Sequence, residues 1–124
     1  MAAVKRRDTA PEMAVRSLVR KNGYRFRLHG RRLPGTPDLV FPRLKKVIFV
    51  HGCFWHGHKR CLRGRRPASR KAFWNKKLDT NIIRDKRDIM RLKRDDWRVL
   101  VIWECELKRM DRLSKRLSTF LAKK

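Results

Sequence analysis

Two short runs of apolar residues constrain what this chain can fold into. Residues 47–50 read Val-Ile-Phe-Val, and residues 99–103 read Val-Leu-Val-Ile-Trp. A strand that is apolar on both faces has to be covered on both sides by other elements. Both runs are far shorter than the roughly 20 residues that a helix needs to span a bilayer. The sequence therefore predicts two buried strands in a covered sheet, and no association with a membrane.

A capping-box pattern predicts the first helix. Thr9 is followed three residues later by Glu12, and Pro11 lies in the first turn, where the missing N–H of proline costs nothing. We expect the helix to end at Asn22 and Gly23, because glycine is favoured just beyond a helix C-terminus. On this interpretation the pattern gives the Glu12 carboxylate a complete structural explanation.

The remaining elements complete a mixed α/β order. Apolar residues keep helical spacing over 73–92 and 107–121, while residues 24–28 alternate as in a half-exposed strand, and residues 39–41 predict one more strand. We therefore expect a single domain over residues 9–124, with a small mixed sheet flanked by helices. Residues 1–8 are expected to form a basic flexible arm.

The charge of the chain indicates its partner. Lys and Arg number 36 against 11 Asp and Glu, which gives a formal net charge of +25. A charge this high points to nucleic acid. Hydrophobic residues still make up 41%, so a wholly disordered basic tail is excluded. No apolar stretch follows the basic N-terminus as it would in a secretory signal, and we expect a cytoplasmic monomer.

The cysteines suggest a metal site. Cys53, His58 and Cys61 lie within nine residues, and Cys105 stands apart. Three thiolates and one imidazole form a complete tetrahedral set for structural Zn²⁺. The alternative is that the cysteines are small buried hydrophobic residues and the histidine lies on the surface. An odd number of cysteines argues against a pure disulfide framework.

Acidic and imidazole side chains flank the first apolar run. Asp38 follows a Pro-Gly turn at the start of a predicted strand, and His51 and His56 follow the buried strand. A carboxylate there could hold Mg²⁺ against a phosphate, and a neutral imidazole could take a proton from water. Asp38 could instead stabilise its own turn, and the histidines could be structural or alternative zinc ligands. Asp85 and Asp88 share a helix face and could orient a histidine or form surface ion pairs.

Two aromatic pairs bracket the most basic loop, residues 59–71. They are Phe54-Trp55 and Phe73-Trp74. Exposed aromatic rings among Lys and Arg could stack on bases or wedge between base steps. Trp74 could instead pack in the core as the start of an amphipathic helix. Of the adjacent pair Phe54 and Trp55, we expect at least one ring to be exposed.

Four segments together resemble one family, the very-short-patch-repair (Vsr) DNA mismatch endonucleases. They read LPGTPD at 33–38, VIFVHGCFWH at 47–56, FW at 73–74 and WRVLVIWEC at 97–105. The resemblance implies a restriction-endonuclease-like fold. It also implies a Mg²⁺-dependent nick beside the thymine of a T·G mismatch in double-stranded DNA, with mismatch-repair proteins as further partners.

The resemblance also implies roles for single residues. Asp38 and the backbone carbonyl of Val50 would bind Mg²⁺, and His56, oriented by Asp85, would be the general base. His51 and Glu12 would fill the remaining polar positions of the active site. The other roles are a DNA wedge formed by Phe54, Trp55 and Trp74, and a structural Zn²⁺ site formed by Cys53, His58, Cys61 and Cys105.

Two other functions remain open from the sequence. One is a related endonuclease of the same fold with a different specificity, which matched and mismatched duplexes would separate. The other is a zinc-stabilised DNA-binding module without catalysis. Asp38 and His56 favour an enzyme over that module, because binding alone needs neither of them.

Overall fold

The computed structural model describes residues 9–58, 61 and 64–123, so the predicted arm over residues 1–8 lies outside the described part of the chain. A four-stranded sheet has the order β1-β2-β3-β4, consisting of β1 (Arg27–Leu28), β2 (Leu39–Phe41), β3 (Lys46–His51) and β4 (Arg98–Trp103). β1, β2 and β3 pair antiparallel, and β3 pairs with β4 in parallel. The mixed sheet expected from the sequence is therefore confirmed.

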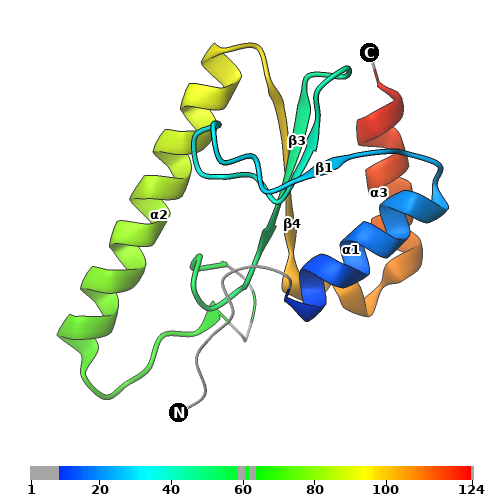
Figure 1. The fold of residues 1–124 in the computed structure, drawn as a ribbon. Helices are drawn as coiled ribbons and strands as arrows, with labels where there is room; N and C mark the ends of the chain where they lie inside the picture. The colour runs from blue at the N-terminus through cyan, green and yellow to red at the C-terminus, as the bar shows by residue number, and fades with distance from the viewer. Residues whose placement is uncertain (1–8, 59–60, 62–63, 124) are drawn as a thin grey trace.

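Helices cover both faces of this sheet. Helix α2 (Lys71–Arg94) lies on one face, and α1 (Ala10–Lys21) and α3 (Met110–Ala122) lie on the other, as Figure 1 shows. The apolar run of β3 divides between the two layers, since Ile48 packs in the core on the α1 and α3 side and Phe49 on the α2 side. The prediction of a covered central strand is thus confirmed. Within the described residues, no helix has the length and apolarity to cross a membrane.

Three elements differ in extent from the sequence prediction. Strand β1 is shorter than residues 24–28, because Tyr24 and Phe26 pack against the core before the chain reaches β2. Helix α2 extends beyond 73–92 at both ends, where charged residues with good helix propensity continue it. The final helix begins at Met110, and Leu107 belongs to a separate 3-10 helix, η2 (Glu104–Lys108). Arg109 separates these two helices, because its φ of −130° is not helical.

A buried lysine fastens the end of α3 to the sheet. Lys46 is 2% exposed, and its Nζ donates to the carbonyl oxygens of Phe120 at 2.5 Å and Leu121 at 3.1 Å. These carbonyls belong to the last turn of α3, where carbonyl oxygens have no hydrogen-bond donor within the helix.

We expect Lys46→Met to lower the free energy of unfolding by about 1–3 kcal/mol, because it leaves those carbonyls without a donor. Urea unfolding monitored by circular dichroism measures the change. Lys45→Met is the matched control, since Lys45 is exposed and, among the residues that the structure describes, its Nζ contacts the exposed Asp95 carbonyl and the Trp97 ring. An equal loss in both variants would contradict this function of Lys46.

One end of the sheet gathers the polar residues predicted from the sequence. The antiparallel register pairs Leu39 with Ile48, so Asp38, just before β2, lies beside the last residues of β3. The parallel register pairs His51 with Trp103, so β3 and β4 end together. The amino end of β2 and the carboxyl ends of β3 and β4 therefore meet at one edge.

Candidate active site and metal centre

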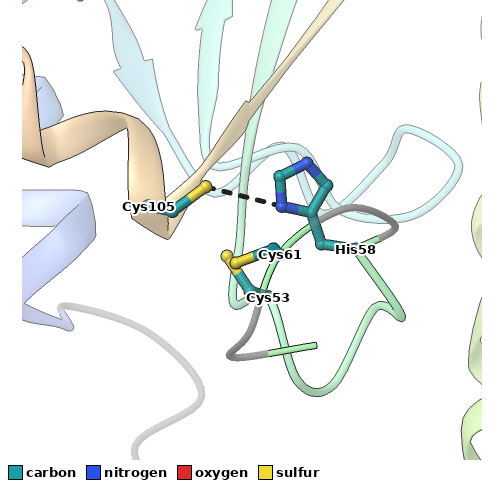
Figure 2. A group of neighbouring side chains, drawn as sticks. All are labelled: Cys53, His58, Cys61 and Cys105. Carbon is teal, nitrogen blue, oxygen red and sulfur yellow. Dashed lines mark hydrogen bonds between the residues drawn. The ribbon is translucent and has the colours of Figure 1, made fainter. Parts of the chain in front are cut away.

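Three thiols and one imidazole converge beyond the ends of β3 and β4 (Figure 2). The ligand atoms of Cys53, His58, Cys61 and Cys105 all lie within 4.8 Å of one another, and Cys105 Sγ is 3.5 Å from His58 Nδ1. The three cysteines are free thiols. A Cys₃His set at this spacing matches the ligand preference of a closed Zn²⁺ site. The cluster could therefore hold a metal.

The local fold explains why these ligands meet. The loop after β3 winds tightly, with the N–H of His58 donating to the Cys53 carbonyl at 2.9 Å. Gly57 allows that loop to lie against α2, because it has a φ of +60° and a Cβ there would be 2.5 Å from Ile82 Cδ1. Cys105 arrives from the first turn of η2, directly after β4.

Burial favours the protonated form of two of these thiols, Cys53 and Cys105, in the absence of a cation. Burial raises the pKa of Cys53 to about 12, and it also raises the pKa of Cys105. A bound cation stabilises thiolates and releases their protons, so metal binding and folding are coupled in such sites. The donor set therefore fits Zn²⁺ chemically as well as geometrically.

Asp38 lies at the amino end of β2, where its carboxylate contacts β3. The N–H of Val50 donates to Asp38 Oδ2 at 2.6 Å, and the N–H of Asp38 donates to the Ile48 carbonyl at 3.0 Å. Burial, with a smaller contribution from the Glu12 carboxylate, raises the pKa of Asp38 to about 7, and the hydrogen bond from Val50 and the charge of Arg16 act in the opposite direction. Burial and the neighbouring carboxylate disfavour the ionised form of Asp38, and a hard cation such as Mg²⁺, which prefers carboxylate oxygens, would offset that charge.

Glu12 is the second carboxylate of this group. The capping prediction is confirmed at Thr9, whose side chain accepts from the Glu12 N–H at 3.4 Å. The Glu12 side chain, however, is buried and has other partners: Arg16 Nη2 at 3.0 Å and His29 Nε2 at 3.5 Å. The capping box is therefore not a complete explanation of this residue, and that interpretation was wrong.

Two histidines and an aspartate form a second group at the same edge. His51 and His56 stack with ring centroids 3.8 Å apart and planes 6° apart, and His56 Nδ1 lies 2.5 Å from Asp85 Oδ2 on α2. If Nδ1 donates to the carboxylate, Nε2 of His56 is left as a proton acceptor. Asp85 could orient a histidine or form a surface ion pair, and the structure shows its contact with a histidine.

The two imidazoles differ in their surroundings. His51 is 6% exposed, and burial, with a smaller effect of His56, lowers its pKa to about 3. His51 therefore stays neutral, and its Nδ1 has no hydrogen-bond partner among the described residues. The His56 side chain is 28% exposed and can meet a solvent molecule or a substrate. The geometry favours His56 over His51 as a base.

Consecutive residues of β3 join the two groups. The Val50 backbone binds the Asp38 carboxylate, and the next side chain, His51, stacks on His56. Within the described part of the chain, no hydrogen bond or ion pair joins the Asp38 carboxylate to His51, His56 or Asp85. The groups are therefore neighbours through β3, leaving Asp38 outside the His51–His56–Asp85 cluster.

Four aromatic rings cluster where α2 begins. Phe54 and Trp55 lie 5.2 Å apart, and Trp74 lies 5.4 Å from Phe54 and 6.0 Å from Trp55. All three are half-buried, so neither open alternative for Trp74 fully describes it. Phe73, 45% exposed, completes the cluster, with the Arg70 guanidinium 4.6 Å above its ring. Basic and aromatic groups are thus combined on one surface.

Sequence reasoning gave no function to three residues of these groups. Arg16 and His29 have no local signal, because their contacts with Glu12 and with each other depend on how α1 meets β1. From the sequence, Trp103 is only a residue of the predicted strand over 99–103 and of the segment WRVLVIWEC at 97–105. Its ring stacks on the His58 ring with centroids 4.1 Å apart, and it makes a T-shaped contact with the His51 ring with centroids 5.2 Å apart. Trp103 therefore links the thiol cluster to the histidines.

Known proteins resemble this chain over almost its whole length. A family model described as DNA mismatch endonuclease Vsr matches residues 1–63. The type II nicking enzyme V.XorIIP of Xanthomonas oryzae is 50% identical over 121 residues, covering 98% of this chain and 88% of that protein. The DNA mismatch endonuclease Vsr of Escherichia coli is 44% identical over 119 residues, covering 96% and 76%. Together with the geometry above, these similarities show that the chain belongs to the Vsr family of DNA mismatch endonucleases.

Proposed function

We propose that this protein is a Mg²⁺-dependent DNA endonuclease that nicks one strand beside the thymine of a T·G mismatch. Its substrate is double-stranded DNA, and mismatch-repair proteins would act on the nicked product. We further propose that residues 9–124 form one domain with a restriction-endonuclease-like fold. Membership in a family of DNA mismatch endonucleases and the basic charge of +25 support this proposal.

One observation carries the proposal: the end of β3 joins an acidic group to a base. Val50 donates its N–H to Asp38 at 2.6 Å, and the neighbouring His51 stacks on a His56 that is hydrogen-bonded to Asp85. Phosphodiester hydrolysis needs charge neutralisation at the phosphate and a base for the attacking water. A protein that only binds DNA needs neither group.

Each residue has a defined task in this scheme. The Asp38 carboxylate and the Val50 carbonyl would hold Mg²⁺, which when bound neutralises the charge that develops on the phosphate. His56 takes the proton of the attacking water at Nε2. Asp85 fixes the orientation and tautomer of that ring through Nδ1. His51 supports the ring by stacking, and Glu12 adds a second carboxylate beside Asp38.

The aromatic cluster is suited to finding the lesion. Phe54, Trp55 and Trp74 combine apolar surface with the nearby Lys77 ammonium, which lies 5.5 Å from the Trp55 ring centroid. Such rings can enter a base step while cations neutralise phosphates. A T·G wobble resists unstacking less than a matched pair, so a wedge would favour the mismatch.

The Cys₃His cluster would hold structural Zn²⁺. Its four ligand atoms form a closed set, which leaves no open position for substrate. The ion would tie the loop after β3 to the start of η2 and so fix the strand end that bears His51.

Paired duplexes test the proposed specificity. Two duplexes that differ only in T·G against T·A are incubated with the protein, with and without Mg²⁺, and each strand is labelled to map the break. We expect one break beside the mismatched thymine, only with Mg²⁺. Equal cutting of both duplexes would favour an endonuclease of other specificity, and binding without any cutting would favour a DNA-binding module.

Removing the base should slow the reaction strongly. We expect His56→Ala to lower the single-turnover nicking rate by about 10²–10⁴-fold, the usual contribution of a positioned general base. Asp85→Asn should lower it by about 10–100-fold, because the ring loses its orienting carboxylate. Asp111→Asn, an exposed change on α3, is the control. Wild-type rates in His56→Ala would remove this residue from the mechanism.

DNA affinity should depend steeply on salt. A protein that contacts six or more phosphates loses about a thousandfold in affinity between low and physiological salt. We expect a loss of this size in fluorescence anisotropy with a T·G duplex at increasing KCl concentration. An affinity that stays constant over the same range would contradict binding through the basic surface.

A further inference from the structure

Arg16 is a buried cation beside Glu12 and Asp38, the two carboxylates at the sheet edge. Arg16, from α1, is 5% exposed, and its Nη2 lies 3.0 Å from Glu12 Oε2. The side chains of this ion pair are 6% and 4% exposed, so water screens them little. The positive charge of Arg16 also acts on Asp38. The Arg16 guanidinium thus pairs with Glu12 and also lowers the pKa of Asp38.

His29 contacts both members of the Arg16–Glu12 ion pair. Its Nε2 lies 3.3 Å from Arg16 Nη2 and 3.5 Å from Glu12 Oε2, and its backbone N–H donates to the Asp38 carbonyl at 3.1 Å. The residue adopts a φ of +49°, a region that residues other than glycine seldom occupy. The hairpin from β1 to β2 therefore brings His29 directly onto the acidic pair.

We propose that Arg16, held by His29, is the resident counter-cation of the Glu12–Asp38 pair and sets how strongly that pair takes a divalent cation. This inference rests on the proposed function, in which Asp38 binds Mg²⁺. Two buried carboxylates side by side repel each other unless a positive charge offsets them. Arg16 supplies that charge in the metal-free protein, and the same charge opposes the entry of a second cation.

The sign of one measurement separates this function from simple structural support. If Arg16 only held the fold together, its loss would loosen the site and weaken cation binding. If it is the counter-cation, its loss removes one positive charge from beside the two carboxylates, and a divalent ion should bind more tightly. At a few ångströms and an effective dielectric near 20, a full charge is large enough to change affinity by about tenfold or more.

The experiment uses the zinc-loaded full chain without DNA and titrates it with Mn²⁺, following the free ion by electron paramagnetic resonance. We expect Arg16→Gln, which removes the charge and keeps a hydrogen-bond donor, to bind Mn²⁺ about tenfold more tightly than wild type. Arg16→Lys should stay within about threefold of wild type, because it keeps the charge. Arg20→Gln, one turn along α1 and over the Phe26 ring, should leave the affinity unchanged.

The outcomes are distinguishable. Equal or weaker Mn²⁺ binding in Arg16→Gln would overturn the counter-cation inference. Mn²⁺ binding that is as tight in Asp38→Asn as in wild type would instead overturn the metal site of the proposed function. Should Arg16→Gln fail to fold, Arg16→Lys decides alone: an affinity within about threefold of wild type supports the inference, and a tenfold loss overturns it.

Discussion

Asp38→Asn should abolish Mg²⁺-dependent nicking of a T·G duplex while the protein still binds that duplex. We expect the single-turnover rate constant to fall by at least about 10³-fold, which corresponds to roughly 4 kcal/mol of transition-state stabilisation. The substitution removes a charged oxygen ligand beside Val50 and leaves the basic and aromatic surface unchanged. Quenched-flow nicking assays and anisotropy titrations measure the two effects separately.

The stability of this variant distinguishes lost chemistry from lost structure. The pKa of Asp38 is raised from 3.8 to about 7, so its contribution to stability is fully present below pH 4 and is lost as the pH rises to about 7. Above that pH the ionised carboxylate is unfavourable in the metal-free protein. We therefore expect metal-free Asp38→Asn at pH 8 to unfold at a temperature no lower than wild type. A variant that cuts at the wild-type rate would remove Asp38 from the chemistry.

Cys105→Ser should lose zinc and much of its stability. We expect about one Zn²⁺ per wild-type chain by elemental analysis and a stoichiometry far below that in the variant. A structural zinc site contributes folding free energy directly, on the order of 10 kcal/mol in small zinc domains. The variant should therefore unfold far below the wild-type temperature, and chelation of the wild-type protein should reproduce the effect.

The same variant tests whether the thiol cluster supports the histidines. Trp103 stacks on His58 and touches His51, so loss of the cluster should also disturb the His51–His56 stack. Ser114→Ala, on the half-buried side of α3, is a control for the general effect of losing a small polar group. A metal-free protein with wild-type stability would show that the cysteines only fill space.

The sequence was sufficient wherever a local pattern dictates structure. The apolar run of β3 predicted a buried strand, and the pattern from Thr9 to Gly23 predicted α1 within a residue at each end. The run of β4 also predicted a strand, but only Leu100 and Ile102 of that strand are buried. The cysteine spacing predicted a cluster that the fold brings together. Each of these signals is either a pattern of a few consecutive residues or a set of residue types that together make a known kind of metal site.

The rest depends on contacts between distant elements. The alternation of residues 24–28 puts Tyr24 and Phe26 on one face, but nothing in it indicates that the strand is limited to Arg27–Leu28. Arg16 and His29 meet at Glu12 only after α1 packs over the sheet edge. In the sequence they are one more arginine in a basic chain and one histidine in a turn, which is why the counter-cation was not predictable.

In the proposed mechanism a divalent cation is held by Asp38 and Val50, beside the His56–Asp85 pair. Fe²⁺ in place of Mg²⁺ tests it directly, because with ascorbate and peroxide the bound ion generates radicals that cut the nearest backbone. We expect cuts in the zinc-loaded chain around residue 38 and around residues 50–51, and we expect these cuts to disappear in Asp38→Asn. Cuts that persist in that variant, or that fall only near the Cys53 loop, would contradict it.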